Sequence, residues 1–374
     1  MAGLYIHIPF CKSRCIYCGF YSTTQIDMRQ EYVDAVCREM EMRCHKDTKI
    51  HTIYFGGGTP SQLTSLQLKK LLDASYIYNK VSEDAEITIE VNPDDVSITF
   101  AEQLPQLGVN RVSMGIQTFN DERLHFLKRR HTATQAVEAV RRLRQAGIQN
   151  ISIDLMYGFP GETLEEWQQD IDAALVLGVE HISAYCLMME EGTPLHRMGI
   201  EPTDEETERQ MYEVLIDKLT VAGFEHYEIS NFARPTYRSR HNSSYWQDLP
   251  YIGLGAAAHS YSVLGSSTAK SAPVRSWNVS DINTYIAAIE RGELPSEQET
   301  LDANTHYNDR ITTALRTSDG LDLTTLSDRH RTFCMKEAQR FLNDGLLRLD
   351  DHRLILTRKG LFVSDMVMSS LMMV

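Results

Sequence analysis

The sequence predicts an α/β protein that consists of an open, partial (β/α)₆ barrel followed by a small, mainly helical C-terminal domain. From residue 3 to about residue 190, short runs rich in β-branched and aromatic residues alternate with amphipathic helical segments. Six such units are present, whereas a complete barrel of this type needs eight. After Gly223 the alternation stops, and helical periodicity returns from about residue 300. A closed barrel and a doubly wound sheet are the alternatives to the open form.

The six expected strands are short apolar runs, each followed by a segment with helical periodicity. The strands are expected at residues 4–8, 50–55, 86–91, 111–119, 151–159 and 181–188. The helices are expected at residues 30–44, 63–78, 99–108, 134–147, 163–178 and 207–223. This order is typical of parallel strands joined by helical crossovers.

The part of the chain after the sixth unit lacks this alternation. Residues 226–233 predict one more strand, and residues 233–260 predict a long loop without helical periodicity. Five aromatic residues argue against disorder of this loop: Tyr237, Tyr245, Trp246, Tyr251 and Tyr261. Beyond residue 300 the order helix, β-hairpin, helix is typical of a winged-helix domain. We therefore expect a barrel at 1–225, an aromatic loop region at 226–299 and a C-terminal domain at 300–374.

Composition excludes several classes of protein. Asp and Glu outnumber Lys and Arg by 51 to 37, which gives a formal net charge of −14. Since no run of Lys and Arg alternates with aromatic residues, we expect no nucleic-acid partner, and none for the C-terminal domain. The N-terminus has no signal-peptide pattern, and no stretch approaches 18 uninterrupted apolar residues. The sequence thus predicts a cytoplasmic protein without an integral membrane segment.

Three of the seven cysteines form a cluster directly after the first expected strand. Cys11, Cys15 and Cys18 lie in the segment FCKSRCIYCGFYS, residues 10–22. A C-x-x-x-C-x-x-C loop can bring three thiolates to one metal or cluster and leaves one coordination position open. An iron–sulfur cluster is the favoured interpretation. Zinc with a histidine such as His7 as fourth ligand, and a cysteine cluster without metal, are the alternatives. The other cysteines are expected to pack in the core: Cys37, Cys44, Cys186 and Cys334.

Glycines and polar residues follow the next strands at the same edge of the predicted sheet. Residues 56–60, GGGTP, lack the Lys-Ser/Thr ending of a phosphate-binding loop, but three glycines allow a backbone to approach a ligand closely. Glu90, which can accept from a ribose hydroxyl, closes the third strand, Gln117 closes the fourth, and Asp154 lies in the fifth. Arg129 or Arg130 could bind a carboxylate through the guanidinium fork. Together these residues suit a small ligand with a ribose, an amine and a carboxylate.

Seven segments resemble the radical SAM proteins, and most closely their HemN/HemW branch of oxygen-independent coproporphyrinogen III oxidases and haem chaperones. The segments are LYIHIPFCKSRCIYC, YFGGGTPS, IEVNP, VSMGIQTF, RRHT, IDLMYGFPGET and YEISNFA. The resemblance implies that Cys11, Cys15 and Cys18 hold a [4Fe-4S] cluster whose open iron S-adenosylmethionine (SAM) chelates. It also implies a set of SAM-site residues: Tyr5, Tyr17, Gly57, Gly58, Thr59, Glu90, Gln117, Arg129, Asp154 and Ala184.

Within that branch, three features favour the chaperones. The oxidase pattern has a further cysteine two positions beyond the triad, where this chain has Phe20. The oxidases also carry a substantial extension before the cysteine motif, whereas here the first expected strand starts almost at Met1. Residues 241–246, HNSSYW, resemble the H-N-x-x-Y-W motif associated with haem binding. A neutral imidazole of His241 can ligate haem iron, while Tyr245 and Trp246 offer flat amphipathic surface. The alternative makes His241 a loop residue that donates to a carbonyl.

The resemblance therefore implies a haem chaperone that carries a SAM-binding [4Fe-4S] cluster and delivers haem to apo-haemoproteins, with respiratory proteins as expected recipients. It is compatible with a homodimer, and it assigns no catalytic residue. The first alternative is an enzyme that converts coproporphyrinogen III to protoporphyrinogen IX by oxidative decarboxylation, in which the cofactor supplies the chemistry. A zinc protein on a barrel scaffold is a second alternative.

Overall fold

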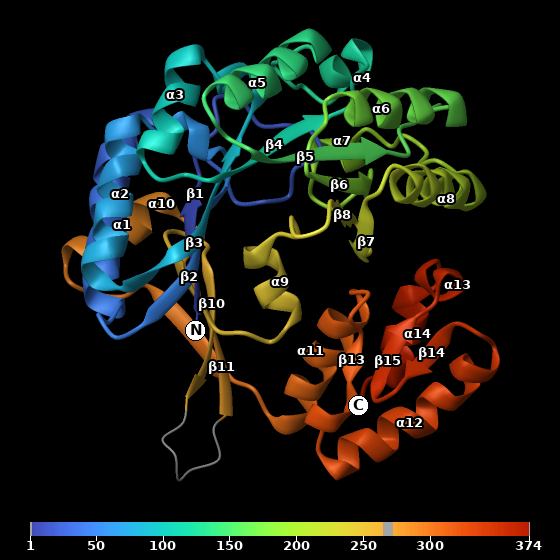
Figure 1. Ribbon diagram of the computed structural model, residues 1–374. Helices are drawn as coiled ribbons and strands as arrows, with labels where there is room; N and C mark the ends of the chain where they lie inside the picture. The colour runs from blue at the N-terminus through green and yellow to red at the C-terminus, as the bar shows by residue number, and fades with distance from the viewer. Residues whose placement is uncertain (1, 265–271, 374) are drawn as a thin grey trace.

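Six parallel strands form the centre of the protein, as the sequence predicts. The computed structural model describes residues 2–264 and 272–373. The parallel strands are β1 (Ala2–Ile8), β2 (Lys49–Gly57), β3 (Lys80–Val91), β4 (Arg111–Gln117), β5 (Asn150–Tyr157) and β6 (His181–Cys186). They are hydrogen-bonded in chain order, and β1 and β6 pair with later strands rather than with each other. The barrel is thus open in the part of the chain that the structure describes (Figure 1).

Helices cover the outer face of these strands (Figure 1). The crossover helices are α1 (Arg29–Arg43), α2 (Ser65–Tyr78), α3 (Ile98–Gln106), α5 (Ala133–Gln145), α6 (Leu164–Val176) and α8 (Glu205–Val221). Thr64, Thr132 and Thr163 begin three of them with capping boxes, which satisfy backbone N–H groups that the first turn leaves free. Two short helices lie beyond β4 and β6: α4 (Asp121–Phe126) and α7 (Pro194–Arg197). Four 3₁₀ turns complete the set: η1 (Ile26–Met28), η2 (Pro60–Gln62), η3 (Pro93–Asp95) and η4 (Leu323–Thr325).

Alternation along the strands separates the packed core from the barrel interior. In β1, Leu4, Ile6 and Ile8 are fully buried in the core shared with the helices. Tyr5 and His7 lie on the other face, where the Tyr5 hydroxyl is 3.0 Å from His7 Nδ1. Side chains two apart on a strand share one face, so every strand presents alternate residues to the interior. This geometry delivers polar side chains from distant parts of the sequence to one interior space.

The segment between the barrel and the C-terminal domain is more ordered than the sequence predicts. Its elements are β7 (Glu225–Glu228), β8 (Asn231–Ala233), α9 (Arg240–Trp246), β9 (Tyr251–Leu254), β10 (His259–Leu264), β11 (Ala272–Asn278), α10 (Ile282–Glu290) and β12 (Ser296–Thr300). The strand expected at 226–233 is an antiparallel hairpin of β7 and β8. The prediction of a loop at 233–260 is wrong where the chain forms α9 and β9. Helix α9 has seven residues, too few to show a helical period, and Ser239 caps it by accepting from the Asn242 N–H.

The C-terminal domain combines helices with a small antiparallel sheet. Its elements are α11 (Ala303–Leu315), β13 (Leu321–Asp322), α12 (Asp328–Asn343), β14 (Leu347–Asp350), β15 (Arg353–Leu356), α13 (Arg358–Leu361) and α14 (Ser364–Leu371). The strand order in the sheet is β13-β15-β14. Because β14 and β15 form an antiparallel hairpin between α12 and α13, the expected order of helix, hairpin and helix is confirmed. The domain has its own hydrophobic core around Tyr307, Ile311 and Phe341. Figure 1 shows it beside the β7–β8 hairpin and α9.

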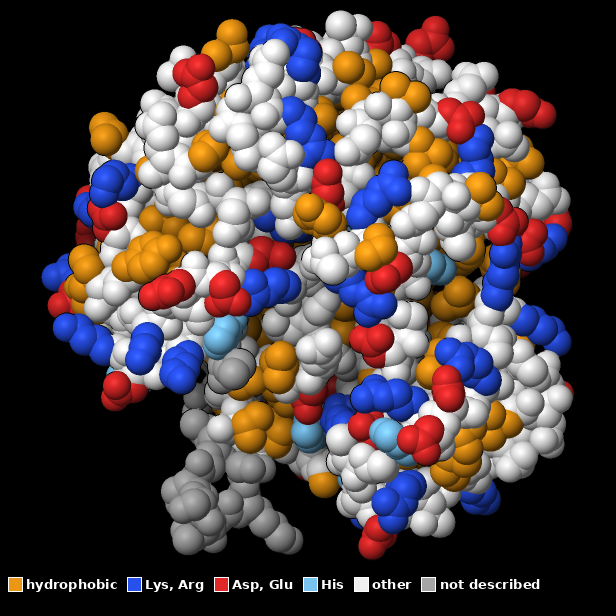
Figure 2. All heavy atoms as spheres, viewed as in Figure 1, with side chains coloured by type: hydrophobic (Ala, Val, Ile, Leu, Met, Phe, Trp, Pro, Cys, Tyr) orange, Lys and Arg blue, Asp and Glu red, His pale blue; other side chains and the backbone are white. Residues whose placement is uncertain are grey.

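Polar contacts join this domain to β7 and to α8 of the barrel. Arg316 lies 2.8 Å from the buried carboxylate of Glu228, and Arg358 lies 2.5 Å from Asp217. On the face seen in Figure 2, acidic and basic side chains are interspersed. Among the described residues, no helix combines the length and apolar character needed to cross a membrane.

Candidate functional site

The three clustered cysteines lie in the loop that leaves the carboxyl end of β1. All three are free and partly exposed. The Cys11 Sγ lies 3.4 Å from the Thr59 hydroxyl, which follows the end of β2. Burial raises the pKa of the Cys11 and Cys18 thiols. The loop and the glycine turn therefore meet at one point, as the parallel strand ends predict.

The glycine turn at the end of β2 leaves a space beside the Cys11 side chain, and a larger residue in the turn would fill that space. Gly57 has φ +114°, a conformation that favours glycine. A Cβ added at Gly58 would lie 3.1 Å from the Cys11 Sγ and 2.6 Å from the Pro9 carbonyl oxygen. The turn thus forms a cradle against the cysteine loop that any side chain at Gly58 would fill.

A partly buried cation faces the cysteine loop from the segment between α4 and α5. Arg129 Nη1 lies 3.6 Å from the Cys15 Sγ, and its Nη2 donates to Asn92 Oδ1 at 2.6 Å. Tyr17 lies against the same group: burial raises the pKa of its hydroxyl, the Arg129 charge opposes the rise, and Cys15 adds to it. An arginine placed here favours negative charge on the loop sulfurs.

Two carboxylic acids lie in the barrel interior next to the cradle. Glu90 accepts from the Tyr54 hydroxyl at 2.8 Å and from the Gly57 N–H at 3.1 Å. Burial raises the pKa of Glu90 to about 7 and that of Asp154 to about 6. Both groups can therefore hold or release a proton near neutral pH, and both face the space that follows the strand ends.

The remaining SAM-site candidates divide into two groups. Gln117, at the end of β4, is buried with φ +74°, and an added Cβ at Gly115 would lie 2.8 Å from its Nε2. Ala184 instead packs its side chain into the core shared with the helices, and its N–H donates to the Ser230 carbonyl at 2.8 Å. The interior therefore gathers polar side chains from β1 to β5, but not the side chain of Ala184.

The donor set fits a [4Fe-4S] cluster and its SAM ligand. Three thiols in one loop, a cradle at Gly58 and the nearby Arg129 cation suit an anionic cluster with one iron left open. Among the residues that the structure describes, no three His, Cys, Asp or Glu side chains gather closely enough to hold a single metal ion. Ligands of a four-iron cluster each bind a different iron, so they need no common point. Glu90 and Asp154 offer acceptors for the hydroxyl and amine groups of a nucleoside ligand.

The HNSSYW segment lies on α9, on the side of the barrel toward the amino ends of the strands. His241 is 1% exposed and lies with its Nδ1 2.7 Å from the Thr52 hydroxyl and its Nε2 2.8 Å from the Tyr245 hydroxyl. Its ring stacks on Tyr54 with centroids 4.9 Å apart. Burial, followed by the charge of Arg111, lowers the pKa of His241 to about 3. The imidazole is thus neutral, as an iron ligand must be, but both nitrogens are already hydrogen-bonded.

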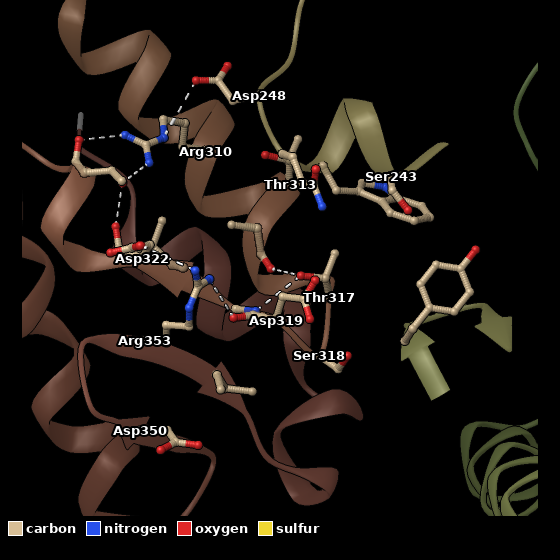
Figure 3. Close-up of a pocket in the computed structure, with 18 of the residues that line it drawn as sticks. Ser243, Asp248, Arg310, Thr313, Thr317, Ser318, Asp319, Asp322, Asp350 and Arg353 are labelled. Atoms are coloured by element: carbon tan, nitrogen blue, oxygen red, sulfur yellow. Dashed lines mark hydrogen bonds and ion pairs between the residues drawn. The ribbon is translucent and has the colours of Figure 1, made fainter. Parts of the chain in front are cut away.

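Trp246 lies on a different face of α9 from His241 and lines a cavity of about 720 Å³ between α9 and the C-terminal domain. Figure 3 shows this cavity, with Ser243 of α9 on one side. The structure therefore divides the motif into an inward part, His241 and Tyr245, and an outward part, Ser243 and Trp246. It does not bring the motif together with the cysteine loop, because Thr52 and Glu86, which hold α9, lie before the ends of β2 and β3.

Two residues outside the expected SAM-site set organise these sites. Asn92, which closes the third expected strand together with Glu90, accepts a hydrogen bond from Arg129 at 2.6 Å and so orients that side chain. Asp95 joins the cysteine loop to the glycine turn by pairing with Lys12 at 3.0 Å and accepting from Ser61 at 2.9 Å. No sequence signal identifies Asp95, since the contact depends on tertiary packing.

Family comparisons agree with this geometry. Residues 5–174 match the radical SAM superfamily model, and residues 301–363 match the HemN C-terminal domain model. The solved structure of coproporphyrinogen III oxidase (HemN) from Escherichia coli, a radical SAM enzyme, superposes with a TM-score of 0.83 and 22% identity. The match covers 99% of this chain and 89% of that one. The protein thus has the fold of a radical SAM protein with a HemN-type C-terminal domain.

Sequence relatives define the family more closely. The heme chaperone HemW of Bacillus subtilis is 40% identical over 285 residues, which cover 74% of each chain. The heme chaperone HemW of Lactococcus lactis is 33% identical over 366 residues, which cover 95% of this chain and 93% of the relative. The chain belongs to the HemW family.

Proposed function

We propose that this protein is a haem chaperone: it binds haem and delivers it to apo-haemoproteins, with respiratory proteins as recipients. The observation that carries the proposal is its membership of the HemW family, at up to 40% identity to relatives named heme chaperones. The H-N-x-x-Y-W motif at 241–246 is the second support, because its neutral imidazole and aromatic rings suit a haem.

The cysteine loop argues against the oxidase alternative. Phe20 stands where the oxidase pattern has its further cysteine, and its side chain is 73% exposed. An exposed phenylalanine is neither a metal ligand nor a packed core residue. We infer that the protein carries the cluster without the complete equipment of coproporphyrinogen III oxidase.

The cluster and SAM would be held at the carboxyl ends of the strands. Cys11, Cys15 and Cys18 would bind three irons, and the turn at Gly57 and Gly58 would let SAM approach. When bound, the cluster supplies an open iron and an electron donor to SAM. Arg129 offsets the negative charge of the sulfurs, and Glu90 and Asp154 bind and orient the nucleoside ligand.

Ligation of haem iron by His241 requires that the hydrogen-bond partners of the imidazole move. The Thr52 and Tyr245 hydroxyls hold both ring nitrogens, and the Glu86 carboxylate accepts from the Arg240 and His241 N–H groups at 3.1 and 3.0 Å. Iron therefore reaches the imidazole only when Tyr245 leaves Nε2. We propose that haem binding displaces this hydroxyl and turns the outer part of α9.

An absorbance titration of haem into anaerobically reconstituted protein tests the proposal. We expect saturation near one haem per chain and markedly weaker binding by His241→Ala. His45→Ala, at an exposed histidine, is the matched control and should titrate like the wild type. Added imidazole should restore part of the lost binding, which a merely unfolded variant would not show. Absence of haem binding, together with repeated conversion of coproporphyrinogen III to protoporphyrinogen IX, would favour the oxidase instead.

A further inference from the structure

The cavity beside α9 has no part in the cysteine site, yet it adjoins the HNSSYW segment. Its volume is about 720 Å³, within the roughly 300–1,000 Å³ usual for small-molecule pockets. One wall consists of α9 and Tyr227 of β7, and the other consists of α11 and the small sheet of the C-terminal domain. Figure 3 shows the polar side chains of α11 and the C-terminal sheet facing the end of α9.

The barrel side of this cavity offers the aromatic surface of Trp246. Its ring packs edge-on against the buried Tyr227, with ring centroids 5.8 Å apart and planes inclined by 63°. The indole is partly exposed, so a ligand can reach it without displacing core side chains. An aromatic wall next to open space suits a large planar ligand.

The C-terminal side offers guanidinium groups that are only loosely engaged. Arg348 lies 2.8 Å from Asp350, and both side chains are largely exposed, at 52% and 66%. Arg353 reaches Asp322 at 3.5 Å and the Asp319 carbonyl at 3.2 Å. Exposed pairs of this kind contribute little to stability, so a ligand carboxylate can replace the protein carboxylate at small cost. A guanidinium has five N–H donors in a fork that matches a carboxylate.

Four arginines and four aspartates line the cavity, and their formal charges cancel: Arg238, Arg310, Arg348, Arg353, Asp248, Asp319, Asp322 and Asp350. The charges are not equally available. Asp248 is held by His306 at 2.7 Å and by the Tyr261 hydroxyl, and Arg310 donates to Thr325. Of the four arginines, Arg348 and Arg353 have the most exposed side chains, at 52% and 43%.

We propose that this cavity is the docking site for haem, in which the porphyrin face packs against Trp246 and its two propionates bind Arg348 and Arg353. The proposal rests on the proposed haem function and adds a site that the C-terminal domain supplies. It explains why α9 presents Trp246 outward while His241 faces inward: the porphyrin docks on the outer face before iron reaches the imidazole. The ligand class is a planar tetrapyrrole with carboxylate side chains.

Binding of iron-free protoporphyrin IX to the full chain, followed by fluorescence, isolates this site from iron ligation. We expect Arg348→Gln and Arg353→Gln each to weaken binding about tenfold, the usual effect of one lost charge-assisted hydrogen bond. Asp350→Asn should tighten binding severalfold, because it releases Arg348. Arg141→Gln, at an equally exposed arginine on α5 paired with Glu138, is the matched control and should leave binding unchanged.

The dimethyl ester of protoporphyrin IX, which has no carboxylates, provides the second arm. It should bind the wild type more weakly and be insensitive to Arg348→Gln. Unchanged protoporphyrin binding by both arginine variants would overturn this inference, as would weakened binding by Asp350→Asn, since that would indicate a structural effect. If the wild type binds haem but not protoporphyrin, this inference is overturned and the proposed function stands. If the wild type binds neither haem nor protoporphyrin, both this inference and the proposed function are overturned.

Discussion

The carboxyl of Glu90 gives a quantitative test of the barrel interior. It lies among Tyr54, Gly57 and Asp154, and burial raises its pKa from 4.5 to about 7. In the unfolded chain the same group titrates at its ordinary value. Glu90→Gln removes the charge and keeps one acceptor oxygen for the Gly57 N–H, while its amide N–H₂ faces the Tyr54 hydroxyl oxygen, which can accept. We therefore expect the variant to be more stable than the wild type wherever Glu90 is ionised.

The sign follows from proton linkage. Because the folded-state pKa of Glu90 lies above the unfolded-state value, the folded protein binds the proton more tightly, and ionisation destabilises it. The cost is absent below pH 4.5, grows between pH 4.5 and about 7, and is complete above that. The difference between the folded-state and unfolded-state pKa values sets an upper limit of about 3 kcal/mol on this destabilisation. Since the carboxyl keeps some exposure to the barrel interior, we expect about 1–2 kcal/mol.

Urea unfolding of the metal-free protein at pH 5 and pH 8, followed by circular dichroism, measures the difference. Glu90→Gln should raise the free energy of unfolding at pH 8 by more than at pH 5. Glu297→Gln, on the exposed strand β12, is the control and should change neither value. The same Glu90 variant should bind SAM more weakly, because an amide replaces the carboxylate acceptor. A variant less stable than the wild type at pH 8 would refute the reasoning.

Two further predictions concern the cluster cradle and the end of α9. Gly58→Ala should prevent reconstitution of the cluster, measured as iron and sulfide per chain, because its Cβ would crowd Cys11; Gly19→Ala, whose Cβ meets only the flexible end of Glu190, should reconstitute normally. Asp248→Asn should lower the free energy of unfolding by about 1–2 kcal/mol, since its carboxylate accepts from Tyr261 and His306. An unchanged urea midpoint for Asp248→Asn would contradict that role.

The barrel and the cysteine site could be predicted because their signals are local. Short β-rich runs that alternate with amphipathic helical segments specify each βα unit, and parallel strands carry the residues after them to one edge. Cys11, Gly58 and Arg129 are far apart in the sequence but meet for this reason. The position of Ala184 differs, because alternation along β6 turns its side chain toward the helices while Ser183 faces the interior.

The region after residue 225 could not be predicted in the same way. Helix α9 is too short for a period, and it forms because Ser239 caps it and Glu86, from another strand, accepts its first N–H groups. Strand β9 pairs in parallel with β1, more than 240 residues earlier in the chain. Such contacts depend on tertiary packing, so no local pattern reveals that His241 lies inside the barrel.

The most direct test of the central claim is transfer of haem to a recipient. Protein loaded with one haem is mixed with increasing concentrations of the apo-form of a respiratory b-type haemoprotein, and the recipient's absorbance is followed by stopped flow. We predict that the transfer rate rises with recipient concentration and exceeds the rate of haem loss to apo-myoglobin, a scavenger. A rate that equals loss to the scavenger and is independent of the recipient would contradict delivery, and would leave a haem-binding protein without chaperone function.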